Sequence, residues 1–237
     1  MTIDAIAVVV PVHDEAELLA DCLASVEIAA RAARGTVARV GVWVVLDACT
    51  DESAAIAARF GVTVLSVDHR SVGAARADGV AAALAEFADV PSARVWTAHT
   101  DADSVVPPHW LLLQCAYADD GAEVLIGTVR PDFRDLSAAQ VAAWQATHTP
   151  GVANGHVHGA NLGVRADVLR AAGGFPPIAE HEDVRLVEAL RAQGARIEAS
   201  DAAWVRTSGR QRGRTAGGYA RYLREDLLRD AASVAMS

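Results

Sequence analysis

The first half of the chain alternates short apolar runs with helical segments, and this alternation limits the fold more than any other feature. The opening run, Ile3 to Val12, is β-branched and almost uninterrupted, as expected of a central parallel strand buried on both faces. Further strands are predicted at Val40–Leu46, Val62–Val67 and Val95–Ala98, and helices at about 15–34, 52–60, 73–87 and 107–118. Strands joined through helices by short connections predict an α/β fold with a doubly wound, mainly parallel sheet flanked by helices.

Acidic residues stand just beyond the carboxyl ends of these strands, where doubly wound sheets bind ligands. They are Asp14, Asp47, Asp101 and Asp103. One residue separates Asp101 from Asp103, so both carboxylates can turn to one point and hold Mg²⁺ or Mn²⁺ through oxygen. The alternative is a solvated loop with two surface aspartates. Pro107 and Pro108, which follow, are expected to open a helix.

The second half has a less regular pattern, and no low-complexity linker marks a domain boundary. Strands are predicted at Val124–Val129, within 159–165 and around Ile197 and Val205, and helices at Ser137–Ala146, about 166–172, Val184–Gln193 and up to about Ala232. An Arg- and Gly-rich segment, Arg206 to Gly218, precedes the last helix. We expect one domain over residues 1–237, with halves at about 1–105 and 106–218 and a C-terminal helix at about 218–233.

Composition excludes several classes of function. The formal net charge of −9 argues against a binder of nucleic acid or anionic membranes. All 21 basic residues are arginine, which removes mechanisms that need a phosphate-loop lysine or a Schiff base. Three widely spaced cysteines indicate neither a disulfide framework nor a zinc knuckle. No segment reaches transmembrane length, and we expect a cytoplasmic protein.

Six motifs, in order, resemble those of the family 2 glycosyltransferases of the GT-A fold, from Ile6 to about Gly218. PVHDEAELLADCLASV resembles the family's opening strand and helix, and LDACTDES its Asp-Gly-Ser-Thr-Asp motif, with Ala48 at the glycine. GAARADG resembles the Ala-Arg-Asn-x-Gly stretch and TDADS the Asp-x-Asp motif. GANLGVRADVLRAAGGF resembles the acceptor-side segment and HEDVRLVEALRAQG the Glu-Asp motif with its helix.

The resemblance implies an inverting, metal-dependent transfer of a sugar from a nucleoside diphosphate sugar, of UDP type, to an acceptor hydroxyl that the sequence does not identify. The first half would then bind the nucleotide sugar and the second the acceptor. Two alternatives stay open: a nucleotide-sugar-binding GT-A protein without independent transferase activity, and a nucleotidyltransferase on a similar sheet. The oligomeric state is open too, with a homodimer among the states considered.

On the donor side, the resemblance places the nucleoside against Pro11, Val12, His13, Asp14 and Glu15. Asp47 would accept a hydrogen bond from a uracil-type ring, or else cap the next helix. Asp14 and Glu15 could instead be an N-cap and a first-turn acid. Arg76 would pair with a phosphate, or with a neighbouring acid.

The metal and the catalytic base come from the two acidic motifs. By the family pattern Asp103 is the direct ligand of Mn²⁺ or Mg²⁺, while Asp101, next to Ala102, faces the ribose or a metal-bound water. The second acid of the Glu-Asp pair, Asp183, would be the base, with Glu182 its rival. Asp183 could also cap the helix that begins at Val184.

The Arg- and Gly-rich segment has two interpretations. It is a solvated surface loop, or it is a lid in which Arg212 and Arg214 contact the phosphates through bidentate guanidinium groups. Thr215 stands where processive family members have tryptophan, so we do not expect a polysaccharide synthase. Histidines gather nearby, but their spacing does not match a zinc site.

Overall fold

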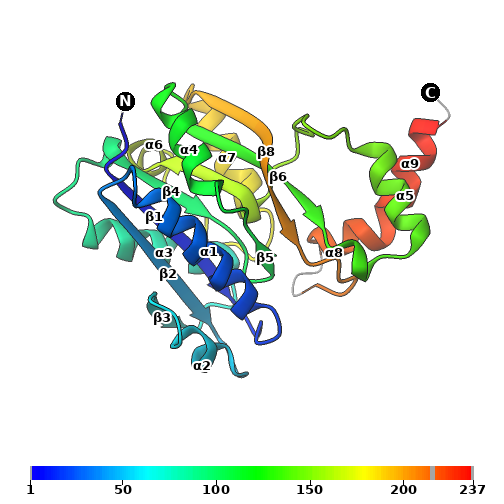
Figure 1. Ribbon diagram of the computed structural model, residues 1–237, viewed down its shortest axis with the longest axis horizontal. Helices are drawn as coiled ribbons and strands as arrows, with labels where there is room; N and C mark the ends of the chain where they lie inside the picture. Colours follow the sequence, from blue (N-terminus) through cyan, green and yellow to red (C-terminus); the bar gives the residue numbers. More distant parts are fainter. Residues whose placement is uncertain (1, 214–216, 236–237) are drawn as a thin grey trace.

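The computed structural model describes residues 2–213 and 217–235, and an eight-stranded sheet lies at its centre (Figure 1). The strands are β1 (Ala5–Val12), β2 (Arg39–Asp47), β3 (Thr63–Val67), β4 (Val95–His99), β5 (Ser104–Val105), β6 (Val124–Pro131), β7 (Leu162–Arg165) and β8 (Ile197–Thr207). Their order in the sheet is β3-β2-β1-β4-β7-β6-β8-β5. β1 to β4 pair in parallel, as do β6 and β8, whereas β7 is antiparallel to both β4 and β6. The predicted doubly wound, mainly parallel sheet is therefore confirmed.

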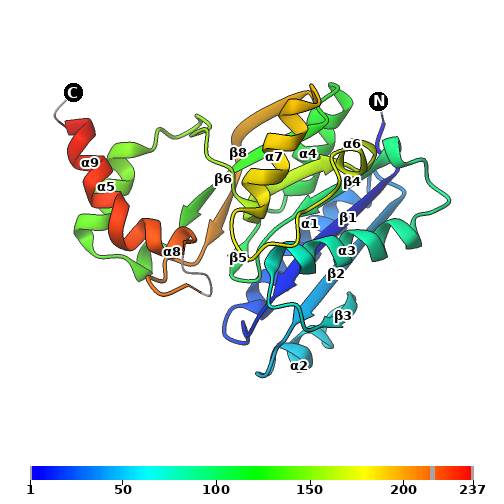
Figure 2. The same ribbon diagram turned by 180° about the vertical axis from the view of Figure 1, so that it is seen from behind.

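Helices cover both faces of this sheet. They are α1 (Leu19–Ala33), α2 (Ser53–Ala57), α3 (Val72–Glu86), α4 (Trp110–Asp119), α5 (Ala138–Thr147), α6 (Ala166–Ala171), α7 (Glu182–Ala192), α8 (Tyr219–Arg221) and α9 (Leu227–Ala235). α1 and α4 lie on one face (Figure 1), and α3, α6 and α7 on the other (Figure 2). β1 is buried along its whole length because its side chains alternate between the two layers. Val8 and Val10 join the core under α1, while Val9 packs with Ala75 of α3.

Two local expectations are corrected. α4 begins at Trp110, not at the prolines, because Pro107 and Pro108 form a turn in which the Trp110 amide donates to the Pro107 carbonyl at 3.0 Å. A single strand, β8, replaces the two strands expected around Ile197 and Val205, and its pairing with β6 shifts register between Gly127 and Val129. The sequence also gave no sign of β5, two residues that follow the acidic loop and pair with the end of β8.

The helices α5, α8 and α9 form a small group to one side of the sheet, connected to it through β6 and β8 (Figure 1). The group has its own core, made of Ala143, Trp144, Leu223 and Leu227. A capping box between Ser137 and Gln140 starts α5. No helix in the described part of the chain is both long and apolar enough to cross a membrane.

Candidate active site

A pocket of about 740 Å³ opens beyond the carboxyl ends of β1, β2 and β4 and faces the start of α7. Residues between 207 and 213 and between 217 and 222 form its opposite wall. The predicted site residues that line it are Pro11, Val12, His13, Glu15, Asp47, Arg76, Asp101, Ala102, Asp103, Glu182 and Asp183. The structure thus brings together residues from both halves of the chain. Asp14 and Arg212 do not line the pocket, and Arg214 lies outside the described residues.

Asp103 lies at the centre of a charged cluster that includes an arginine from the opposite wall. Arg210 Nη2 is 3.0 Å from Asp103 Oδ2, and the same guanidinium donates to both oxygens of Glu15 at 2.5 and 2.8 Å. Asp103 Oδ1 accepts from the hydroxyl of Thr207 at 3.2 Å. Burial and the neighbouring charge of Asp101 raise the pKa of Asp103 to about 6, although Arg210 acts in the opposite direction.

Arg76 connects the acidic loop to the start of α7. It is 1% exposed, although it extends from α3. Its Nε donates to Glu182 Oε1 at 3.1 Å, and its Nη2 donates to Asp101 Oδ1. Its Nη1 is buried and has no hydrogen-bond partner in the structure. Of the two interpretations of Arg76, the structure shows the pairing with acids; the contact with phosphate stays a prediction.

The two acids of the Glu-Asp motif have different surroundings. Glu182 is 5% exposed and bound to Arg76, and burial raises its pKa. Asp183 accepts from the backbone amides of Gly159 at 2.6 Å and Val184 at 2.7 Å. α7 begins at Glu182, two residues earlier than predicted, and its N-cap is His181 in the left-handed region, with φ 61°. Asp183 therefore does not cap α7, and that expectation is corrected.

Asp47 organises the loop that follows β3. It is 3% exposed, and its carboxylate accepts from the amides of His69, Arg70 and Ser71 at 2.7 to 2.8 Å. It does not cap α2, whose N-cap is Glu52, so that alternative is wrong. The next residue, Ala48, has φ 53° in the left-handed region that favours glycine, which explains why the related motif has glycine there.

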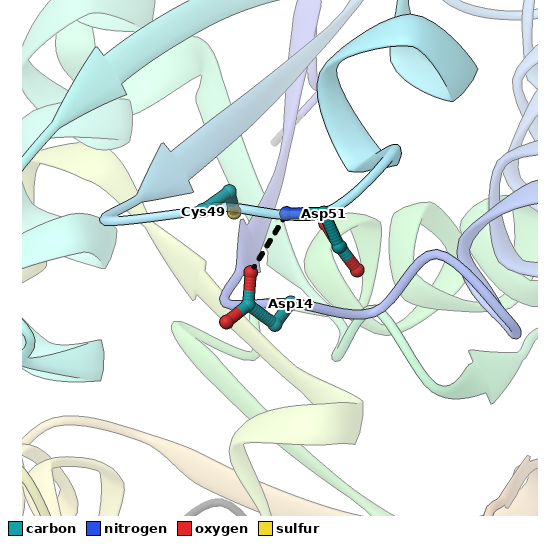
Figure 3. Close-up of side chains that lie close together, drawn as sticks. All are labelled: Asp14, Cys49 and Asp51. Atoms are coloured by element: carbon teal, nitrogen blue, oxygen red, sulfur yellow. Dashed lines mark hydrogen bonds between the residues drawn. The ribbon is translucent and has the colours of Figure 1, made fainter.

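Asp14 belongs to a structural junction between two loops. With Cys49 and Asp51 it forms the one group of potential metal-binding side chains, among the residues that the structure describes, in which three ligand atoms lie close together (Figure 3). However, Asp14 accepts from the amides of Thr50 and Asp51, and Asp51 from those of Ala16 and Ser53. These carboxylates tie the loop after β1 to the loop after β2.

The donor set around Asp103 fits a divalent cation. Mg²⁺ and Mn²⁺ are commonly held by one or two carboxylates, with water and substrate phosphates completing the shell. Asp103 offers such a carboxylate in the pocket wall, and Asp101 is two residues away on the same loop. The sequence did not single out three features of this site: Arg210 as a partner of the acids, the hydroxyl of Thr207, and β5, which places both beside Asp103.

Aromatic and imidazole rings line the far wall of the pocket. His158 lies edge-on to Tyr219, with ring centroids 5.6 Å apart, and Tyr219 stacks on Tyr222. The indole of Trp144 donates to the Tyr219 hydroxyl at 3.2 Å. Burial and the nearby imidazoles of His156 and His148 lower the pKa of His158 to about 4, so this ring is neutral near pH 7.

The fold and the pocket define a class: an α/β protein with an acidic site beyond the carboxyl ends of its parallel strands, faced by a second carboxylate pair on a helix. The sequence profile of Glycosyl transferase family 2 matches residues 7–159, which is more than half of the chain. The protein belongs to glycosyl transferase family 2. No curated protein matched the chain.

Solved structures share the fold at low sequence identity. TarS 1–349 of S. aureus in complex with UDP-GlcNAc superposes with a TM-score of 0.65 at 16% identity, over 98% of this chain and 67% of that one. The mannosyltransferase PcManGT from Pyrobaculum calidifontis, in complex with GDP-Man and Mn²⁺, gives 0.62 at 20% identity, over 97% and 73%. Glucosyl-3-phosphoglycerate synthase from Mycobacterium tuberculosis, in complex with UDP, gives 0.58 at 17%, over 97% and 80%. The chain spans 66% of another TarS 1–349 structure and 36% of a TarS structure. These matches confirm the GT-A fold.

Proposed function

We propose that this protein transfers a sugar, with inversion, from a nucleoside diphosphate sugar of UDP type to an acceptor hydroxyl. The observation that carries the proposal is the presence in one pocket of the acidic loop, with Asp101 and Asp103, and of a further carboxylate, Asp183, at the start of α7. An inverting transfer uses both kinds of group, because the hydroxyl attacks the anomeric carbon from the face opposite the departing phosphate and a base must accept its proton there.

Asp183 is the proposed general base. The bond from the acceptor oxygen to the anomeric carbon forms as the bond to the diphosphate breaks, and the hydroxyl proton passes to the Asp183 carboxylate. The amides of Gly159 and Val184 hold one oxygen each of this carboxylate, so its orientation is set before the acceptor binds. Glu182 suits the role less well because it is buried and committed to Arg76.

On the donor side, the proposed contacts follow the pocket wall. The nucleoside lies against the loop after β1 and near Asp47, whose carboxylate also holds the loop 69–71. Asp103, with Asp101 as a neighbour, would hold Mn²⁺ or Mg²⁺, which supplies positive charge against the diphosphate. The donors in the related structures, UDP-GlcNAc and GDP-Man, support a nucleoside diphosphate sugar without selecting the sugar.

The base assignment is tested by a pair of variants that each remove one charge. We expect Asp183→Asn to slow Mn²⁺-dependent release of UDP from a donor panel by roughly 100-fold or more, while UDP binding measured by calorimetry persists. Its melting temperature should fall by only a few degrees, since asparagine can accept one of the two amide bonds. The matched variant Glu182→Gln should lose stability, because it weakens the pairing of a buried arginine, but retain more activity. A larger loss of turnover in Glu182→Gln would transfer the role of base to Glu182.

The metal dependence is tested on binding. UDP affinity should be markedly higher with Mn²⁺ than with EDTA, and Asp103→Ala should remove that difference while its circular dichroism spectrum stays like that of the wild type. Equal UDP affinity of the wild type under both conditions would contradict the metal proposal.

A further inference from the structure

Arg210 is the only described basic side chain that directly contacts Asp103. It belongs to the segment after β8, which hydrogen bonds attach to the rest of the fold: among them, the amide of Ser208 donates to the Asp103 carbonyl at 3.1 Å, and that of Gly209 donates to Asp135 Oδ2 at 2.9 Å. Its guanidinium also donates to both oxygens of Glu15, in the loop after β1. One cation of the protein thus bridges two carboxylates from different parts of the fold.

This bridge uses the oxygens that a divalent cation at Asp103 would need. Asp103 Oδ2 is 3.0 Å from Arg210 Nη2, and Asp103 Oδ1 receives the hydroxyls of Thr207 and Ser104 at 3.2 and 3.3 Å. A guanidinium and a metal ion cannot occupy the same side of one carboxylate oxygen, and each reduces the negative charge that attracts the other. Arg210 and the metal ion therefore oppose each other at Asp103.

We propose that Arg210 is an internal counterion that competes with the divalent cation for Asp103 and is released when a diphosphate binds. The inference rests on the proposed function. The half-buried arginine, with 28% of its side chain exposed, lines the pocket, so a bound diphosphate would lie within its reach. Guanidinium groups bind phosphate oxygens as well as carboxylates in a bidentate manner. A diphosphate therefore offers Arg210 a new partner and frees Asp103 for the metal ion.

The consequence is that metal ion and nucleotide bind cooperatively. Before the diphosphate arrives, Arg210 neutralises Asp103 and Glu15 and keeps metal affinity low. The diphosphate raises metal affinity and, by thermodynamic reciprocity, the metal ion raises diphosphate affinity by the same factor. The contact between Arg210 and Asp103 would prevent the site from holding a metal ion before the nucleoside diphosphate sugar binds.

The test measures Mn²⁺ binding to the full chain without nucleotide, by the electron paramagnetic resonance signal of free Mn²⁺. We expect Arg210→Gln to bind Mn²⁺ roughly tenfold more tightly than the wild type. The control is Arg206→Gln, which removes the same charge from the end of β8, where Arg206 pairs with Asp132 and is 41% exposed. It should bind Mn²⁺ within about twofold of the wild type, because Arg206 is partly exposed and pairs with Asp132, not with Asp103.

Further variants make the outcome decisive. Adding Asp103→Asn to Arg210→Gln should abolish the gain, and a gain that persisted would place the ion elsewhere, for example at Asp14 and Asp51, and overturn the proposal. Equal or weaker Mn²⁺ binding by folded Arg210→Gln would overturn it too. If Arg210→Gln does not fold, Arg210→Met replaces it, since methionine keeps a long side chain but removes the charge, and unchanged Mn²⁺ affinity in that variant would refute the inference. Wild-type protein that binds UDP equally with and without Mn²⁺ would contradict both this cooperativity and the metal part of the proposed function, whereas Mn²⁺ binding without nucleotide tests the competition at Asp103 by itself.

Discussion

At the scale of single residues, two adjacent carboxylates in the site, Glu182 and Asp183, differ in their hydrogen-bond partners. Glu182 is buried against Arg76, whereas Asp183 is held by two amides at the pocket wall. Removing one partner from a buried ion pair leaves an uncompensated charge, so Glu182 and Arg76 are positioning residues for each other. The described partners of Asp183 are backbone amides and not a buried cation, which is the physical reason that Asp183 is the proposed base.

His158 predicts a dependence of stability on pH. Its pKa in the folded protein, about 4, lies below the ordinary value of 6.5, so the unfolded chain binds a proton more readily. Its contribution to stability is complete above pH 6.5 and is lost as the pH falls toward 4. Between pH 7 and pH 5 the free energy of unfolding should fall by up to about 2 kcal/mol on account of this residue.

Urea denaturation of His158→Gln at the two pH values checks this prediction. The difference between pH 7 and pH 5 should shrink by that amount relative to the wild type, whereas His109→Gln, which changes an exposed histidine, should leave it unaltered. An unchanged difference in His158→Gln would show that the ring is not kept neutral by folding.

At the scale of elements, the pocket depends on close contact between the start of α3 and the loop before α7. The amide of Gly73 donates to the Ile178 carbonyl at 3.1 Å. A methyl group on Gly73 would lie 2.8 Å from that oxygen and nearer still to the carbonyl of Pro176. The loop from 176 to 181 leads directly into Glu182 and Asp183, so the glycine sets the distance between Arg76 and the proposed base.

We therefore expect Gly73→Ala to destabilise the protein by about 1–3 kcal/mol, through the shift that overpacking forces, and to reduce turnover. Gly61→Ala is the matched control, because a methyl group there meets no atom within 4 Å. It should change stability by no more than about 0.5 kcal/mol. Equal denaturation midpoints for the two variants would show that the loop before α7 adjusts freely.

At the scale of the whole molecule, the sheet and the helical group beside it differ in their cores. α5 and α9 are joined by a small cluster in which Trp144, Leu223 and Leu227 are buried, whereas β1 and β4 lie within the large core under α1 and α4. A region with few buried apolar side chains opens at lower free energy. The helical group carries Tyr219 and Tyr222 on the pocket wall, so its opening would alter the pocket.

Hydrogen exchange followed by mass spectrometry should show faster exchange in α5 than in β1 and β4. Leu227→Ala, which removes a fully buried side chain, should accelerate exchange in α5 because it weakens the small core by about 2–5 kcal/mol. Peptides from β1 should be unaffected. Acceleration in β1 as well would show that the sheet and the helical group unfold as one unit.

The sequence alone determined the architecture of the first half and the position of the acids along the chain. Strand and helix patterns are local, because the period of apolar residues reports the element in which they lie. Ile3 to Val12 could therefore be assigned to a central strand, and Asp47, Asp101 and Asp103 to strand ends, before any contact was known. The order of motifs in turn indicated the family.

Only the tertiary structure decided which charges meet. Arg210 and Glu15 are 195 residues apart, and Arg76 and Glu182 are 106 apart, so no local pattern relates them. β5 and the single strand β8 also depend on pairing between distant segments. A charged side chain in the sequence shows that a partner is needed, but the partner is whichever group the chain's path through the sheet places beside it.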